Sequence, residues 1–339
     1  MNSSSSLKLI FLFVCAFAFT NARANIFRVN NNLATDKTKN IFASLQEAHD
    51  ASAGAGTDTL LIEGSTKEYA GFDCSKKLVI IGPGYFLTQN GGQASSLSAT
   101  VQAINFNPGS DGSVIMGLLF SSASGAYHPN IYTNGIAIIR CNLPNGIVIA
   151  ANITSLVILQ NYIGANIAVS SGVITFSGVI VKNNIMNELD VTSSTGYPRI
   201  FATVEHNIIN SYAIFTASIC QSNILTYGSI NITSNTIQNN LAASNTVAAI
   251  PTNLLYQNGQ TFIGSTAANG SPDGQYKLPV NSPYAAAGYN GEQIGAFGGT
   301  EPYVISGIPP IPTIYQLQTD AIANKQDGLN VTIKARANQ

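Results

Sequence analysis

The sequence predicts an all-β chain folded as a right-handed parallel β-helix, a solenoid with an N-terminal capping helix and a C-terminal extended tail. Between residues 136 and 237, an alternating apolar stretch runs into an asparagine six times. A self-similar unit of about 20 residues indicates a solenoid. Charged residues make up only 9% of the chain, against about 25% in typical proteins. Uncharged polar residues alternate with β-branched ones, which suits sheets with one buried and one wet face.

The repeated asparagines mark the expected coils. They are Asn142, Asn161, Asn184, Asn207, Asn223 and Asn235. The first three intervals are 19, 23 and 23 residues, and the last two fall to 16 and 12. Since a right-handed coil needs about 20 residues or more, we expect a regular ladder from Asn142 to Asn207. Asn223 and Asn235 should turn different corners.

Asparagine suits a corner between strands for two reasons. It tolerates a positive φ better than most residues. Its amide both donates and accepts, so stacked asparagines can satisfy one another when buried. The alternative is that these amides face a ligand. Apolar neighbours on both sides of each asparagine favour the structural role.

Residues 1–24 have the pattern of a secretory signal peptide. Lys8 precedes an apolar run from Leu9 to Phe19, and small residues around Arg23 prepare a cleavage site near Ala24. The alternative is a short membrane anchor, but the run is only about half the length needed to span a bilayer. We therefore expect a mature chain without a membrane span, secreted to the extracellular space or held at the cell surface.

Residues 25–300 should form the β-helix. A short helix over Phe42 to His49, capped by Ser44 or Asn40, would cover the open end of the first coil. Residues 241–300 lose the repeat and form a closing segment. Residues 301–312 are proline-rich and read as an extended linker. Residues 313–339 form a tail with one strand, Leu329 to Ala335, which could fold back or pair with another chain.

These segments resemble a known family. The capping-helix region with its first strands, the Asn-Ile coils, and the run from Ser282 to Phe297 are similar to secreted bacterial proteins of the pectate-lyase-like superfamily. The tail from Gly307 resembles that of secreted proteins from Bacteroidota-type bacteria. The resemblance implies a right-handed parallel β-helix, and family members include polysaccharide lyases and glycoside hydrolases.

The charged residues offer little for such chemistry. Calcium-dependent lyases of this shape use several carboxylates with a Lys or Arg base, and hydrolases need two carboxylates about 5–10 Å apart. No catalytic motif of the family matches, so no catalytic residue, metal ligand or cofactor is assigned. The best surface cluster is Lys182, Glu188, Asp190, Arg199 and Glu205. Lys182 and Glu205 are one coil apart, so they could form a surface ion pair worth about 0–1 kcal/mol. The loop at 187–199 is where an enzyme would carry its site.

Three functions remain open. The first is a non-catalytic structural, adhesive or glycan-binding scaffold with an extracellular polysaccharide or surface protein as partner, and with self-association through the C-terminal strand. The second is a divergent polysaccharide lyase or hydrolase. The third, an ice-binding array, is disfavoured because the threonines are irregularly spaced. A net charge of −1 offers no footprint for nucleic acid. Cys74, Cys141 and Cys220 are expected to be buried small hydrophobes rather than disulfide partners or reactive thiols.

Overall fold

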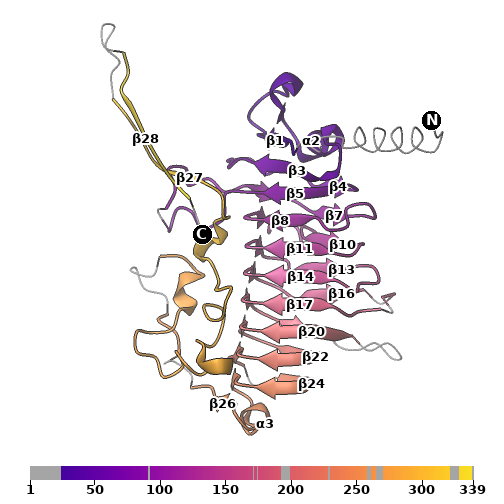
Figure 1. Cartoon of the computed structure of the whole chain (residues 1–339), viewed down its shortest axis with the longest axis vertical. Coiled ribbons are helices and arrows are strands. Elements are labelled where there is room, and N and C mark those ends of the chain that lie inside the picture. Colours follow the sequence, from indigo (N-terminus) through magenta and orange to yellow (C-terminus); the bar gives the residue numbers. More distant parts are fainter. Residues whose placement is uncertain are drawn as a thin grey trace, which may run out of the picture.

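The fold is a β-solenoid, described by a computed structural model for residues 24–337 except 91, 171, 174, 192–198, 228–229, 258–260, 265–269 and 321–327. The coils stack into three parallel sheets of twelve, nine and five strands, and a separate antiparallel hairpin stands beside them (Figure 1). The predicted signal peptide lies outside the described residues, apart from Ala24. No helix in the described part is long and apolar enough to cross a bilayer.

The largest sheet has twelve strands. They are β1 (Ile26–Val29), β2 (Ile41–Phe42), β3 (Ala55–Ile62), β5 (Lys77–Ile81), β8 (Val114–Met116), β11 (Ile136–Ile139), β14 (Leu156–Leu159), β17 (Val179–Lys182), β19 (Leu189–Asp190), β20 (Ile200–Glu205), β22 (Ala213–Gln221) and β24 (Ile230–Gln238). Alternate side chains point inward, so that Ile138, Ile158 and Val181 stack at 0% exposure. Each such burial contributes about 1.5–3 kcal/mol.

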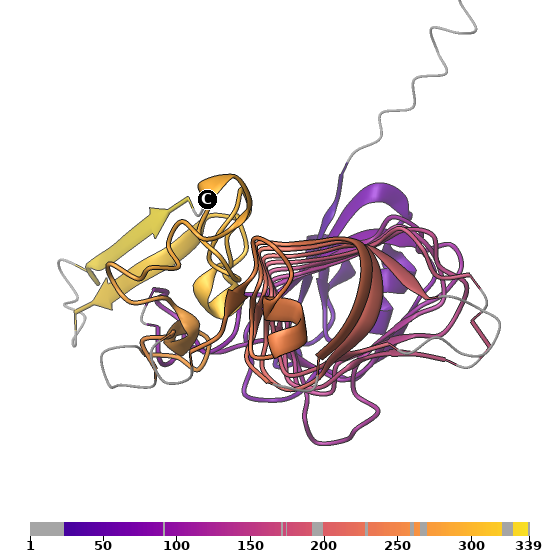
Figure 2. The same cartoon turned by 90° about the horizontal axis from the view of Figure 1, so that it is seen from below.

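Two narrower sheets complete the coils, one along most of the solenoid and one in five coils only. The nine-stranded sheet holds β6 (Thr100–Val101), β9 (Leu119–Phe120), β12 (Asn142–Leu143), β15 (Tyr162–Ile163), β18 (Ile185–Met186), β21 (Ile208–Ile209), β23 (Ile224–Leu225), β25 (Leu241–Ala242) and β26 (Leu254–Leu255). The five-stranded sheet holds β4 (Phe72–Cys74), β7 (Ile104–Phe106), β10 (Pro129–Ile131), β13 (Ile147–Ile149) and β16 (Ile167–Val169). Figure 2 shows the coils superposed along the solenoid axis.

A helix closes each end of the core. The first is α2 (Leu45–Ala51), which begins one turn later than the sequence predicted because Ile41–Phe42 forms β2. Ser44 is the N-cap, with its hydroxyl accepting from the amide of Glu47, whereas Asn40 ends the short helix η1 (Lys37–Lys39). At the other end lies α3 (Asn245–Ala248), whose Val247 side chain enters the core.

A ladder of stacked asparagines runs from coil to coil. Each of them is the residue just before a strand of the nine-stranded sheet. Its members are Asn161, Asn184, Asn207, Asn223, Asn240 and Asn253. Oδ1 of Asn184 accepts from both the backbone amide and Nδ2 of Asn161, at 2.8 and 3.0 Å. Nδ2 of Asn184 also donates to the carbonyls of Ile158 and Lys182. The same set of bonds recurs at Asn207, Asn223 and Asn240, so these buried amides are satisfied within the protein.

Two predicted members lie outside this ladder. Asn142 is the first residue of β12, and the ladder position before it holds Cys141, whose backbone amide donates to Asn161 Oδ1. Asn235 lies inside strand β24 with its side chain exposed, and Asn240 takes its place. The ladder asparagine itself does not have the positive φ that was expected at the corner. The residue just before it does, for example Gln160 at 58° and Asn183 at 52°.

Asn223 was expected on a different corner but continues the ladder, because the residues between β19 and β20 have no counterpart in the next coil. β22 pairs with β19 and β20 together: Leu189 aligns with Ala213, and Ile200 aligns with Thr216. The chain between Asp190 and Ile200 in one coil is therefore replaced by a continuous strand in the next. The corner itself is unchanged, so an interval of 16 residues still closes a coil.

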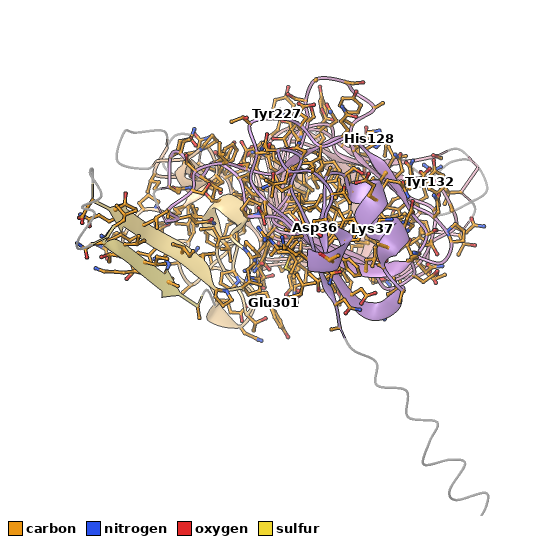
Figure 3. The ribbon with its side chains drawn as sticks, turned by 90° about the horizontal axis from the view of Figure 1, so that it is seen from above. Asp36, Lys37, His128, Tyr132, Tyr227 and Glu301 are labelled. Atoms are coloured by element: carbon orange, nitrogen blue, oxygen red, sulfur yellow. The ribbon has the colours of Figure 1, made fainter. Side chains whose placement is uncertain are left out.

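The segment after the last coil returns along the outside of the solenoid. We call residues 284–308 the strap, and it includes the single turns η4 (Tyr289–Gly291) and η5 (Ile305–Gly307). Another such turn, η3 (Gly274–Tyr276), precedes it. The sequence assigned 301–312 to a linker, but Tyr303 and Ser306 are buried against the coils. The tail also has two strands rather than one, β27 (Thr313–Thr319) and β28 (Val331–Arg336). Seen from the N-terminal end, their hairpin lies to one side of the coils (Figure 3).

Candidate functional site

A column of polar side chains lies at the ends of neighbouring strands in the twelve-stranded sheet. The register pairs Lys182 with Glu205, Glu205 with Gln221, and Gln221 with Gln238. Parallel strands stack about 4.8 Å apart, so these side chains can bond to one another directly. Lys182 Nζ lies 3.2 Å from Glu205 Oε2, and Gln221 Nε2 donates to Glu205 Oε1 at 2.7 Å. Gln238 Nε2 donates in turn to Gln221 Oε1 at 2.8 Å.

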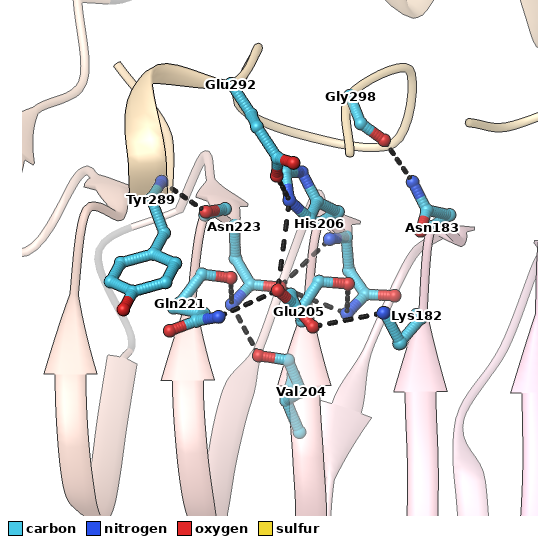
Figure 4. Close-up of polar contacts among 12 residues, drawn as sticks. Lys182, Asn183, Val204, Glu205, His206, Gln221, Asn223, Tyr289, Glu292 and Gly298 are labelled. Carbon is cyan, nitrogen blue, oxygen red and sulfur yellow. Dashed lines mark hydrogen bonds and ion pairs between the residues drawn. The ribbon is translucent and has the colours of Figure 1, made fainter. Parts of the chain in front are cut away.

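His206 connects this column to the strap. It follows Glu205 at the corner and has a φ of 54°. Its ring is 2% exposed, with Nε2 3.1 Å from Glu292 Oε2 and 3.9 Å from Glu205 Oε1. Figure 4 shows this ring between the strand ends and the strap. The histidine therefore lies between two carboxylates, one on the solenoid and one on the strap.

The corner residues of other coils, which share the positive φ of His206, also bind the strap. Asn183 Nδ2 donates to the carbonyls of Ala296 and Gly298, at 2.9 and 2.7 Å. Further along the solenoid, Ser222 Oγ accepts from the amide of Tyr289. Similar bonds run from Arg140 to the Ile308 carbonyl, from Gln160 to the carbonyls of Glu301 and Pro302, and from Asn239 to the Ala287 carbonyl. This corner column thus presents one polar side chain per coil to the backbone of the strap.

Buried hydroxyls and a carboxylate hold the strap where it reaches the N-terminal coils. Tyr85 and Tyr303 place their hydroxyl oxygens 2.5 Å apart. The Tyr303 hydroxyl donates to Asp273 Oδ2 at 3.2 Å, and the amide of Ser306 donates to the same oxygen at 2.7 Å. Burial raises the pKa of both Tyr85 and Tyr303 well above the usual range, so both stay protonated. All of these groups are buried, which favours a structural role.

Only part of the predicted surface cluster comes together. Lys182 and Glu205 form the expected ion pair. Arg199 lies elsewhere, 7% exposed, and its guanidinium donates to the carbonyls of Val169 and Ser170. Asp190 is in β19, where its backbone amide donates to Asn166 Oδ1. Glu188 is half-buried just before β19. The predicted loop at 187–199 is described only at its ends, since 192–198 lie outside the described residues.

The sequence analysis singled out neither His206 nor Glu292, which lies in the closing segment 241–300. The available signal was the residue before each repeated asparagine, which is polar in Gln160, Asn183 and His206. In the part of the chain that the structure describes, no group of three His, Cys, Asp or Glu side chains is arranged to hold a metal ion.

A pocket of about 480 Å³ lies where strand β27 of the hairpin meets the first coils. Its walls are largely apolar and include Leu61, Leu97, Pro309, Ile314 and Leu317. It therefore lies between the first coils and the apolar side of the hairpin, away from the His206 cluster.

No family model, curated protein or solved structure matches this chain. The assignment of the fold as a parallel β-solenoid therefore rests on the strand pairing of this chain. The likeness to the pectate-lyase-like superfamily stays an expectation from sequence motifs.

Proposed function

We propose that this protein is a secreted or cell-surface scaffold without catalytic activity, in which the solenoid is a rigid body that engages an extracellular polysaccharide or another surface protein. The β-solenoid fits such a role, because stacked coils give a long and regular surface. Secretion is supported by the charge and hydrophobicity pattern of residues 1–24.

The proposal rests on one observation: the ionisable side chains around His206 are bonded to one another and to the strap. Glu205 is held by Lys182 and Gln221, and His206 is held against Glu292 beneath the strap. A glycosidase needs two carboxylates that flank the scissile bond with room for substrate or water between them. Here the space between Glu205 and Glu292 contains a buried imidazole. The cluster is therefore suited to fastening the strap rather than to receiving a sugar.

A lyase or hydrolase is the second candidate, favoured by one feature. The side chains of Lys182 and Glu205 keep 24% and 16% of their surface exposed, so a base and a carboxylate lie side by side at the surface. A fold analogy alone cannot assign a reaction to them.

One assay separates the two candidates. The protein is incubated with pectins, alginates and glycosaminoglycans, with and without Ca²⁺, and released unsaturated or reducing sugar is measured. We expect no release. Turnover that disappears in both Glu205→Gln and Lys182→Met, but persists in the control Glu188→Gln, would overturn the scaffold proposal.

Binding is tested separately. The same preparation is applied to a glycan array and to intact cells of the producing species. In a separate experiment, the full chain is expressed in these cells and its location is determined. We expect retention at the surface or on a defined class of extracellular glycan. A chain that stays in the cell interior and binds no glycan or surface would contradict the proposal.

A further inference from the structure

Strand β24 has one open side. It pairs in parallel with β22 over Ile230 to Gln238, and no other strand among the described residues pairs with it. Figure 1 shows it at the C-terminal end of the twelve-stranded sheet. A nine-residue strand at this position presents a row of unpaired backbone donors and acceptors to its surroundings.

This edge lacks the usual protection against pairing. Natural edge strands are blunted by charged side chains, by proline or by a covering element. β24 contains neither a charged residue nor a proline. No Asp, Glu, Lys, Arg or His occurs anywhere from Asn207 to Pro272, so the last coils offer no charge that would repel an incoming strand.

The end cap limits what can occupy the edge. Helix α3 packs near β25 and β26 and inserts Val247 into the core. The α3 helix occupies a layer of about 8–10 Å, whereas a strand paired with β24 would have to lie about 4.8 Å from it. The helix therefore prevents a second solenoid from stacking squarely on this end. A strand that projects from its own body can lie beside β24 without meeting the cap.

The hairpin supplies such a strand. β28 pairs only with β27 among the described residues, so its outer side is open, whereas β27 receives a bond from the Ala94 amide to the Ile314 carbonyl on its other side. Figures 1 and 2 show the hairpin standing clear of the coils. An isolated two-stranded hairpin is marginally stable in water, so additional pairing would stabilise it.

The two faces of β28 match those of β24. On one face of β28, Val331 and Ile333 are 49% and 58% exposed. Lys334 and Arg336 belong to the opposite face by strand alternation, and Arg336 lies over the Tyr315 ring. On β24, Ile232 packs against the core, while exposed side chains point outward from Asn231, Thr233 and Asn235. Side-by-side pairing would continue the apolar row with apolar residues and the polar row with polar ones.

We propose that β28 of one copy pairs with the open edge of β24 in a second copy. The two surfaces lie at opposite ends of the molecule, so the contact is head-to-tail and leaves one free hairpin and one free edge in every assembly that does not close into a ring. The protein is therefore a self-assembling unit that forms open chains. This inference holds whether or not the coils bind a glycan.

The test uses two kinds of variant of the full protein. The acceptor variant carries Thr233→Lys and Asn235→Lys, which place positive charge opposite Lys334 and Arg336. The donor variant carries Ile333→Asp, with Val331→Asp as an independent second donor variant. All four positions are exposed in the single chain, so the melting temperature should stay close to that of the parent protein.

Light scattering across a concentration series measures the outcome. We expect the parent protein to grow beyond a dimer, and each variant alone to remain monomeric. An equimolar mixture of acceptor and donor variants should give a 1:1 dimer and nothing larger, because only one intact hairpin and one intact edge meet. The matched control Asn235→Glu should assemble at least as well as the parent at low salt and lose that advantage at high salt.

Three results would overturn the proposal. One is a parent protein that is monomeric at every concentration. Another is an acceptor variant that still dimerises, which would show hairpin-to-hairpin association instead. The third is a mixture of folded variants that yields no dimer.

Discussion

His206 and Glu292 are 86 positions apart in the sequence, yet Nε2 of the histidine lies 3.1 Å from Oε2 of the glutamate. The first residue belongs to a corner of the solenoid, and the second belongs to the strap that returns along it. Together with the other bonds of the corner column, this contact holds the strap along the coils. The contact also engages the imidazole of His206, which would otherwise be the most obvious acid–base group at this surface.

Removing the carboxylate should loosen the strap. We expect Glu292→Ala to lower the free energy of unfolding by about 1 kcal/mol, the usual net value of one such bond. The backbone amides of residues 287–298 should exchange faster with solvent, as measured by hydrogen exchange. The control is Glu301→Ala, since Glu301 contributes its backbone carbonyl rather than its side chain. Equal exchange in both variants would show that the contact does not hold the strap.

The asparagine ladder should be sensitive to truncation. Asn184→Ala removes an acceptor for two donors of Asn161 and leaves the Asn207 side chain without one of its donors. Because the vacated groups are buried, the loss should be about 1–3 kcal/mol or more in a urea titration. The matched control is Asn235→Ala, an exposed position outside the ladder, which should change stability by less than about 0.5 kcal/mol. Similar losses at the two positions would mean that the ladder is not special.

The sequence could predict the solenoid because its evidence is periodic. Buried positions such as Ile138, Ile158 and Val181 recur once per coil, and every coil repeats the same alternation. The exact register was harder. Asn142 and Asn161 both end an apolar stretch, and only the backbone corner shows that Cys141, not Asn142, occupies the ladder position. An error of one residue leaves the sequence pattern nearly unchanged.

The contacts of the strap could not be predicted in the same way. Lys182 and Glu205 are one coil apart, so their pairing follows from the repeat. Glu292 belongs to no repeat, and its partner is decided by where the chain returns along the solenoid. The shortened coil at Asn223 was misjudged for a related reason, because a deleted loop and a changed corner give the same interval in sequence.

Gly298 lies in the strap next to the His206 ring. A Cβ added at Gly298 would overlap the carbonyl oxygen of Gln293 and come to 3.0 Å from His206 Nδ1. Gly298→Ala should therefore force the strap outward and cost about 1–3 kcal/mol, as overpacking usually does. Limited proteolysis should then cut within the strap sooner. Gly125→Ala is the matched control, because its Cβ would enter open space. Unaltered cleavage in Gly298→Ala would show that the strap tolerates the displacement.

The three cysteines in the described chain should be inert in the native protein. Cys74, Cys141 and Cys220 are free and buried. Burial raises the pKa of Cys74 to about 11 and the pKa of Cys141 and Cys220 to about 12. The thiolate is the reactive form, so iodoacetamide at pH 8 should modify none of them. Mass spectrometry should find all three modified after unfolding in guanidinium. Rapid labelling of any one in the native state would contradict its burial.

The same pKa shifts give the stability a direction at alkaline pH. A thiol with a pKa near 9 in the unfolded chain loses its proton there first, while the buried thiol keeps it. The folded state then binds more protons, so the free energy of unfolding falls as pH rises above about 9 and continues to fall until the folded thiol ionises. Each buried thiol should cost about 1 kcal/mol by pH 10. Cys141→Ala is less stable at neutral pH but should lose less further stability between pH 8 and pH 10 in urea titrations. Parallel losses in the variant and the parent would assign the alkaline effect to other groups.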